Sequence, residues 1–416
     1  MQHPFGIEFS EGVCAMTEQL VNLALRRAGA ATLADFQREN GLPQTGQTDE
    51  ATGKRLLPLL LGYERHRVQR GDTLWTLARR YGTCVRAIET ANPGVDASRL
   101  RVGQTLTVPL GFPVVPTDVP FPSELLALCV RGLTARYPAI SSRPIAVTLR
   151  GKPVTLLKFG QGPRSVLYNA SHHANEWITT PILLHFLEQY ADAVSGGGTI
   201  FDRDARALFR RTQLYLVPMV NPDGVDLVTG ALRPGDQFYR TAELIAAYYP
   251  AIRFPDGWKA NLSGVDLNLN YPAEWEQAKK IKAAQGFDGP APRDFVGEAP
   301  LDQPESRAMA ALTRQVNPRL TLSYHSQGEE IYWKFLDFAP AGAQLIGEEF
   351  ALVSGYALCD PAFQSSFAGY KDWFLQEFNR PAYTVEVGLG VNPLPITDFP
   401  SIYDKNLGIL TLGLER

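Results

Sequence analysis

The sequence predicts an α/β fold, in which a large domain with a mixed, mostly parallel sheet flanked by helices follows two smaller modules. Three observations support this prediction. The chain has 416 residues, which is too long for one typical domain. Strand-like apolar runs alternate with helix-like segments from about residue 121 to the C-terminus. A proline-rich segment at residues 111–122, typical of a stiff linker, separates this region from what precedes it.

The composition argues against several classes of partner. The apolar fraction of 45% and the charged fraction of 20% are those of an ordinary globular protein. A formal net charge of −3 gives no field that would attract nucleic acid or anionic lipid. The longest apolar run, Leu56 to Leu61, contains Pro58 and is far shorter than the roughly 18 residues that span a bilayer. We therefore expect neither a nucleic-acid nor a membrane partner, and the oligomeric state is left open.

The N-terminus shows no basic segment followed by an apolar stretch, so no secretory signal is visible and we expect synthesis in the cytoplasm. The four cysteines are scattered without the spacing of a metal site or a redox motif. We expect them to be free thiols: Cys14, Cys84, Cys129 and Cys359.

Residues 1–63 form the first predicted module. Apolar residues recur at helical spacing at Leu20, Leu23, Leu25, Leu33 and Phe36. Thr48 is predicted to cap a further helix, with two acidic residues in its first turn. The segment 36–46 resembles the core of the peptidoglycan-binding-domain-like family, a three-helix module, while a helical spacer is the alternative. The resemblance implies binding to cell wall.

Residues 64–112 form the second predicted module, with the order strand, helix, helix, strand. Asp72 or Thr73 can cap the first helix, whose expected apolar face is Leu74, Leu77, Ala78 and Tyr81. The segment 92–94, Asn-Pro-Gly, ends the second helix, and residues 100–109 lead into the closing strand. The module resembles the LysM family, which binds glycans that contain N-acetylglucosamine. That resemblance implies peptidoglycan as a partner, or chitin as the alternative.

Residues 113–416 form the third predicted domain. The expected strands are residues 145–149, 166–170, 214–220, 320–324 and 382–387, and two of the expected helices are residues 177–190 and 305–316. His173 and Glu176 follow one strand, and His325 ends another. Since the carboxyl ends of strands carry the sites of open α/β sheets, these three side chains are candidates for one cation. Two histidines and a glutamate leave zinc one free position for water.

Further segments in the same order make this domain resemble the zinc carboxypeptidase family. They are 258–261 (Trp-Lys-Ala-Asn), 264–272 (Gly-Val-Asp-Leu-Asn-Leu-Asn-Tyr-Pro) and 384–388 (Thr-Val-Glu-Val-Gly). The resemblance implies Zn²⁺ bound by His173, Glu176 and His325. It places the general base at Glu386, a substrate-binding asparagine at Asn268, and the carbonyl-polarising cation at Lys259, where the family has arginine.

Two positions depart from that family. Leu269 stands where the family keeps an arginine that binds a terminal carboxylate, and leucine cannot pair with a carboxylate. This puts ordinary trimming of C-terminal residues in doubt. Tyr370 is the candidate for the tyrosine that closes over substrate, with a core aromatic as an equal alternative.

The combination of modules resembles the γ-D-glutamyl-meso-diaminopimelate peptidase I family of bacteria. The resemblance implies metal-assisted hydrolysis of the bond between γ-D-glutamate and diaminopimelate in stem peptides of cell-wall or spore peptidoglycan, with a role in sporulation among the expectations. Glu386 would transfer the protons and Lys259 would stabilise the oxyanion. The alternatives are a peptidoglycan carboxypeptidase using Arg253 or Arg240 for the terminal carboxylate, a small-molecule deacylase, and an inactive wall-binding protein.

Overall fold

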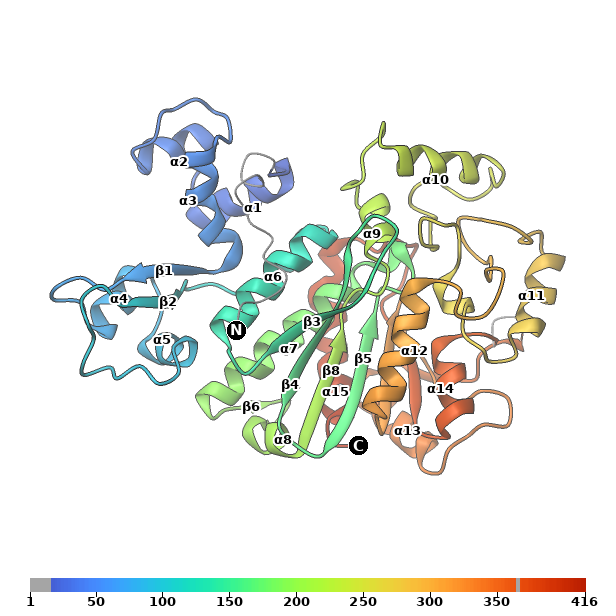
Figure 1. The fold of residues 1–416 in the computed structure, drawn as a ribbon. Coiled ribbons are helices and arrows are strands. Elements are labelled where there is room, and N and C mark those ends of the chain that lie inside the picture. Colours follow the sequence, from blue (N-terminus) through green and yellow to red (C-terminus); the bar gives the residue numbers. More distant parts are fainter. Residues whose placement is uncertain (1–15, 364–366) are drawn as a thin grey trace. The chain divides into compact units, whose positions relative to one another are not determined.

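The structure, a computed structural model, describes residues 16–363 and 367–416 (Figure 1). The expectations for the extreme N-terminus and for Cys14 lie outside these residues. The chain divides into two compact units, one comprising residues up to 119 together with 125–138, and one comprising 120–124 and 139–416. Helix α6 (Ser123–Arg136) carries the chain across this boundary.

The first unit begins with three helices, α1 (Glu18–Ala28), α2 (Leu33–Glu39) and α3 (Glu50–Leu61). Asp49 caps α3, because its carboxylate accepts a 2.7 Å hydrogen bond from the backbone N of Thr52. The prediction of Thr48 as this cap was therefore wrong by one residue. The buried amide of Gln37 donates to the backbone carbonyl of Gln47 and accepts from the backbone N of Gly46, which fixes the turn before α3.

The same unit continues with the predicted strand, helix, helix, strand order. Strand β1 (Tyr63–Arg67) pairs antiparallel with β2 (Thr105–Pro109), and α4 (Leu74–Arg80) and α5 (Val85–Ala91) lie between them in the chain. Thr73 caps α4 and exchanges hydrogen bonds with Thr76 in a capping box. The core between strands and helices consists of Val68, Leu74, Leu77, Ala78, Ile88, Leu106 and Val108, with Tyr81 partly buried against it.

The second unit is built on an eight-stranded mixed sheet with the order β11-β10-β12-β9-β5-β8-β4-β3. Its four central strands, β12, β9, β5 and β8, are parallel, as the sequence predicts. The strand bounds are β3 (Ser141–Val147), β4 (Pro153–Gly160), β5 (Arg164–Ala170), β8 (Thr212–Val217), β9 (Leu320–His325), β10 (Glu330–Tyr332), β11 (Ala357–Cys359) and β12 (Ala382–Glu386). The expected strand at 145–149 ends at Val147, because the chain turns at residues 148–152 with Gly151 at φ +77°.

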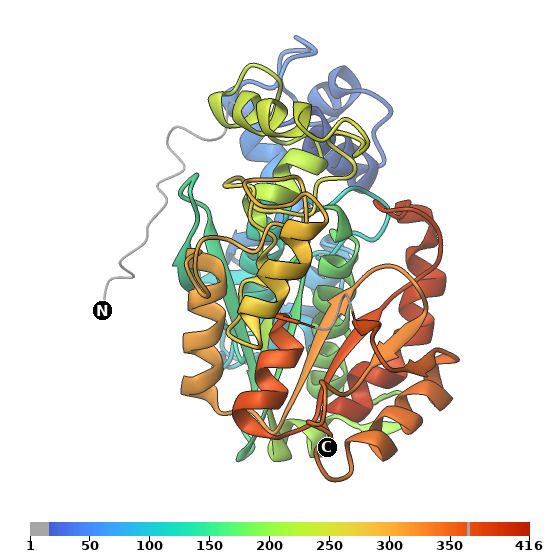
Figure 2. The ribbon, with the colours of Figure 1, turned by 90° about the vertical axis from the view of Figure 1, so that its right-hand side faces the viewer.

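Helices cover both faces of this sheet (Figure 2). Leu167 of β5 packs into the cluster that α12 and α14 bury, while the hydroxyl of its neighbour Tyr168 donates to the backbone carbonyl of Leu410 in α15. Successive residues of β5 therefore face opposite layers, which explains why Leu167 and Tyr168 are both buried. The covering helices are α7 (Thr179–Gly196), α12 (Pro304–Val316), α13 (Ala343–Ser354), α14 (Tyr370–Phe378) and α15 (Phe399–Gly413).

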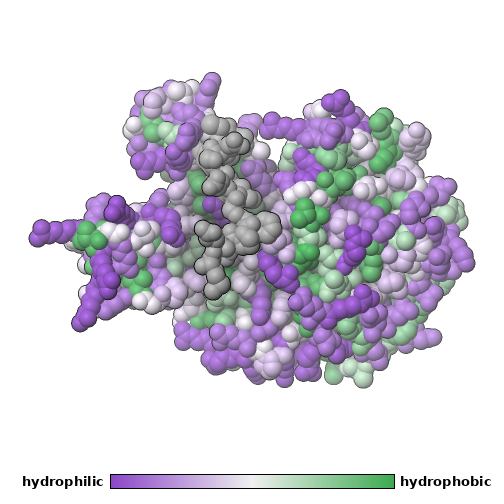
Figure 3. All heavy atoms as spheres, in the orientation of Figure 1, coloured by the Kyte–Doolittle hydropathy of each residue, from purple (hydrophilic) through white to green (hydrophobic). Residues whose placement is uncertain are grey.

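Shorter elements fill the connections of the second unit. They are β6 (Thr199–Ile200), β7 (Arg203–Asp204), α8 (Ala205–Arg211), α9 (Pro222–Val228), α10 (Gln237–Ala247) and α11 (Trp275–Ala284). Among the described residues, no helix combines the length and apolar character that crossing a membrane requires. Figure 3 shows a face on which polar side chains predominate.

Candidate active site

The turn that follows β5 is held in a conformation that most residues avoid. Ser171 has a left-handed backbone (φ +50°) and is fully buried. Its backbone N donates to Oγ1 of Thr179, and its hydroxyl lies 2.9 Å from Oγ1 of Thr180, both at the start of α7. These bonds fix the direction in which the chain leaves the strand, and so they position the two residues that follow within the next turn, His173 and Glu176.

The three predicted metal ligands meet at one point. Nδ1 of His173 lies 2.9 Å from Oε1 of Glu176, and Nδ1 of His325 lies 2.9 Å from Oε2 of the same carboxylate. One ligand atom from each residue lies within 4.8 Å of the others, which makes this a group that could hold a metal ion. Two imidazoles and one carboxylate are a donor set that suits zinc.

The register of the sheet brings Glu386 to the same place. In the parallel pair of β12 and β9, Glu386 stands beside His325, at the carboxyl end of both strands. Burial raises the pKa of Glu386 to about 8, with the carboxylate of Glu176 adding to the increase and Lys259 opposing it. Glu386 is therefore a partly buried carboxyl group within electrostatic reach of the candidate ligands.

Lys259 is anchored directly to this group. Its Nζ donates a 2.9 Å hydrogen bond to Oε1 of Glu176. The loop that carries Lys259 is tied to the loop after β5 by Asn221, whose side-chain amide donates to the backbone carbonyls of His172 and Ala260. Asn221 is fully buried and also caps α9, so a turn to which the sequence assigned no chemistry has a structural function beside the site.

Asp266 contacts the candidate site, although sequence reasoning assigned it no function. Its Oδ1 lies 3.1 Å from Nε2 of His173, the ring nitrogen that does not face Glu176. Burial acts to raise the pKa of Asp266, but His173 and Lys259 outweigh it and lower this pKa overall. A carboxylate on the outer nitrogen of a metal-binding histidine fixes the orientation of the ring. The sequence does single out the segment that contains Asp266, because Asn268 belongs to the same segment.

Comparison with known proteins agrees with this geometry. The family model for zinc carboxypeptidase matches residues 128–344. Gamma-D-glutamyl-L-diamino acid endopeptidase 1 of Lysinibacillus sphaericus is 45% identical over 285 residues, which are 68% of this chain and 70% of that protein. The chain belongs to the zinc carboxypeptidase family. It is therefore a zinc metallopeptidase by family, and His173, Glu176 and His325 are the residues that would hold the ion.

Other comparisons extend this result. An uncharacterized protein of Bacillus subtilis is 39% identical over 67% of this chain and 73% of its own length. The crystal structure of thrombin activatable fibrinolysis inhibitor matches 78% of this chain and 92% of its own, with a TM-score of 0.56 and 15% identity, which supports the fold alone. The LysM family model matches residues 66–109, so the strand–helix–helix–strand module is a LysM domain.

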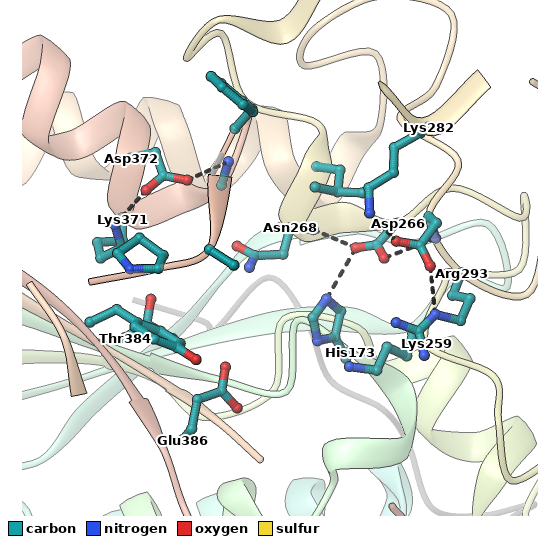
Figure 4. Close-up of a pocket in the computed structure, with 17 residues that line it drawn as sticks. His173, Lys259, Asp266, Asn268, Lys282, Arg293, Lys371, Asp372, Thr384 and Glu386 are labelled. Atoms are coloured by element: carbon teal, nitrogen blue, oxygen red, sulfur yellow. Dashed lines mark hydrogen bonds and ion pairs between the residues drawn. The ribbon is translucent and has the colours of Figure 1, made fainter. Parts of the chain in front are cut away.

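A pocket of about 280 Å³ opens beside the candidate metal-binding group of this zinc carboxypeptidase-family chain (Figure 4). His173, Lys259 and Glu386 line it together with Asn268 and Leu269. The carboxamide oxygen of Asn268 accepts a hydrogen bond from the backbone N of Tyr370, so this side chain is held by the protein. Leu269 contributes an apolar wall to the pocket.

Tyr370 does not contact the pocket. Its side chain is fully buried, and its hydroxyl lies 2.8 Å from Oγ1 of Thr313 in α12. The prediction of Tyr370 as a substrate-closing residue was wrong, because the start of α14 turns this ring toward the core, where it packs against Tyr271 and Trp373. The alternative of a core aromatic is the one that the structure supports.

Two arginines that the sequence offered for a terminal carboxylate also lie outside the pocket lining. Arg253 is largely exposed and pairs with Asp256, while Arg240 donates to the backbone carbonyl of Gly235. A different arginine, Arg293, lines the pocket. No pattern in the sequence indicates this arginine, because it lies in a loop without periodicity.

Proposed function

We propose that this chain is a zinc-dependent endopeptidase that hydrolyses the γ-D-glutamyl–diaminopimelate bond of peptidoglycan stem peptides. The observation that carries the proposal is the group formed by His173, Glu176 and His325. It lies beside a pocket that His173 lines together with Glu386 and Lys259. The 45% identical relative is named as an endopeptidase for gamma-D-glutamyl-L-diamino acid bonds. The LysM domain supports a substrate within a glycan-containing wall.

In the proposed reaction, the residues of the chain move the protons and stabilise the developing charge. Glu386 accepts a proton from the attacking water and delivers it to the leaving amine. Lys259 stabilises the negative charge that develops on the carbonyl oxygen. His173, Glu176 and His325 would hold a zinc ion, which when bound would supply a Lewis acid for the carbonyl and for water.

The proposal extends to the rest of the chain and to its place of action. We propose domains at 1–63, 64–112 and 113–416, with the first as a second wall-binding module and Asn268 as a residue that contacts substrate. LysM binding to glycan strands would keep the peptidase near its stem peptides and raise their local concentration. The enzyme would then act on cell-wall or spore peptidoglycan, and sporulation is one setting for it.

The test is digestion of defined muropeptides by the purified full chain, with products weighed by mass spectrometry. When zinc is present, we expect one product that ends in L-alanyl-D-glutamate, still attached to the muramic acid, and a second product that is a free peptide beginning with diaminopimelate. Neither should form after treatment with a chelator, and added zinc should restore the activity. Release of a terminal D-alanine instead would favour the peptidoglycan carboxypeptidase.

Two further results would contradict the proposal. Absence of turnover on all muropeptides by the zinc-loaded chain would favour a wall-binding protein without activity. Cleavage of small acylated amines in preference to muropeptides would favour the deacylase.

A further inference from the structure

The pocket contains a cation that the family resemblance does not assign. Arg293 lines it on the side where Lys259 and His173 lie, whereas Lys371 and Asp372 lie across the pocket (Figure 4). Position 269, which would otherwise provide a guanidinium, is leucine. The pocket therefore keeps an arginine, but from a different segment of the chain.

The guanidinium of Arg293 is held at one end only. Its Nε donates a 2.6 Å hydrogen bond to Oδ2 of Asp294. Within the described residues, neither of its terminal nitrogens has a protein hydrogen-bond partner, and the side chain is 42% exposed. Two parallel N–H groups in one plane are the arrangement that binds a carboxylate with two hydrogen bonds.

Asp294 is itself fixed by the site, so it can hold the arginine in place. Its backbone N donates to Oδ2 of Asp266, the residue that orients His173. Its Oδ1 accepts a 2.5 Å hydrogen bond from Nζ of Lys282. Asp294 has a left-handed backbone (φ +68°), a strained conformation for an aspartate that needs such surrounding bonds to persist. Hydrogen bonds through Asp294 and Asp266 therefore connect Arg293 to His173, one of the candidate metal ligands.

Of Lys259 and Arg293, two cations on this side of the pocket, one is free to bind an anionic group of the substrate. Lys259 and Arg293 are close enough that the arginine lowers the pKa of the lysine, although Glu176 raises that pKa overall. Lys259 is engaged by Glu176, whereas the terminal nitrogens of Arg293 point to no protein acceptor among the described residues. A substrate carboxylate would satisfy them.

We propose that Arg293 binds the free α-carboxylate of the γ-linked glutamate, and so makes the enzyme selective for γ-glutamyl amides. This inference rests on the proposed function. In a γ-linkage, the side-chain carboxyl forms the amide, so the α-carboxylate stays free on the acyl side of the bond that is cut. An ordinary α-peptide bond offers no such group. Arg293 lies on the same side of the pocket as Lys259, the residue assigned to the acyl oxygen in the proposed reaction, and we place the glutamate on this side.

The test compares kcat/KM of the zinc-loaded full chain for two synthetic L-alanyl-γ-D-glutamyl-diaminopimelate peptides. One has the glutamate α-carboxylate free, and the other has it as an amide. We expect the wild-type chain to prefer the free carboxylate by about 10- to 100-fold. Arg293→Met should abolish this preference, while Arg293→Lys should keep part of it, because it retains the charge and loses the fork. The ratio of the two kcat/KM values does not depend on the fraction of the enzyme that is folded.

Arg253→Met is the matched control, since Arg253 is exposed and does not line the pocket; it should leave the preference unchanged. A third peptide is amidated at the side-chain carboxylate of diaminopimelate. Relative to the peptide with all carboxylates free, its loss in kcat/KM should be no larger for Arg293→Met than for the wild type. A preference that follows this second carboxylate, or equal cleavage of both first peptides by the wild type, would overturn the inference and leave the endopeptidase intact.

Binding of the product L-alanyl-D-glutamate, measured by calorimetry, separates the two hypotheses even if turnover is absent. A loss of affinity of at least about 10-fold in Arg293→Met supports the assignment. Unchanged affinity contradicts it. Failure of the wild-type chain to cleave any of the peptides would instead count against the proposed function.

Discussion

Lys259 donates its hydrogen bond to Glu176, a candidate metal ligand, across a distance of 2.9 Å. The cation and the carboxylate come from loops that are 83 positions apart in the sequence. Burial acts to lower the pKa of Lys259, but the charge of Glu176 outweighs it, and this pKa is raised. The ammonium of Lys259 therefore stays charged at neutral pH beside the candidate metal-binding group.

Substitution of Lys259 by methionine should lower kcat by about 100- to 1,000-fold, because the oxyanion loses a charged donor. Lys259→Arg should recover much of the activity, since it restores the charge. Steady-state kinetics at saturating zinc would check this result. If Lys259 only supports Glu176, kcat at saturating zinc would be normal and zinc affinity alone would fall.

Substitution of Asp266 by asparagine should weaken zinc binding by about 10- to 100-fold, because the outer nitrogen of His173 loses its carboxylate partner. Competition with a chromogenic chelator would measure the affinity. Asp118→Asn, in the other unit and exposed, is the control and should not change it. Equal zinc affinity in Asp266→Asn and the wild type would show that Asp266 does not orient the ring.

Substitution of Glu386 by glutamine should lower kcat by about 100- to 10,000-fold while zinc content stays the same. The amide keeps the size of the side chain but cannot accept the proton. Metal analysis and rapid-quench kinetics on the same preparation would check both parts. Activity close to that of the wild type would rule out Glu386 as the general base.

Glu305 provides a prediction about stability that is independent of catalysis. It is almost completely buried at the start of α12, and its Oε2 has no hydrogen-bond partner in the described residues. Burial raises the pKa of Glu305 from 4.5 to about 7, with Asp223 adding to the increase. Because the folded state favours the neutral form, this residue costs least stability below pH 4.5, and the cost grows until the pH passes 7.

The substitution Glu305→Gln should therefore stabilise the chain more at pH 8 than at pH 5. The difference in the free energy of unfolding should grow by roughly 2 to 3 kcal/mol between these two values. Urea titrations at both values would measure it, with the exposed Glu243→Gln as control. A gain that is the same at both values would mean that Glu305 does not titrate in this range.

Much of the site could be predicted because strand ends are visible in a sequence. His325 and Glu386 each close an apolar run, and such runs become the parallel strands β9 and β12. Their register, which sets the two residues side by side, follows from the sheet order rather than from either segment alone. The central parallel strands and the helices between them were confirmed, whereas β4 was not predicted and the strand at 145–149 was misplaced.

What the sequence could not provide is the direction of side chains outside regular patterns. Tyr370 begins a helix, and only the packing of α14 decides whether its ring faces the core or the pocket. Arg293 lies in a loop whose path depends on a left-handed aspartate, for which no local pattern is diagnostic. Asp266 lay within a segment already singled out, but its contact with His173 is a tertiary interaction.

The buried amide of Asn221 links the turn that carries His173 and Glu176, two of the candidate metal ligands, to the loop that carries Lys259. Because both segments are hydrogen-bonded to the same side chain, they are expected to move together. Thermal motion at this edge of the sheet would then displace the Lys259 ammonium and the candidate ligands together, so that the distances between them change little. Loss of these hydrogen bonds would first alter the position of Lys259 relative to the candidate ligands, before the chain unfolds.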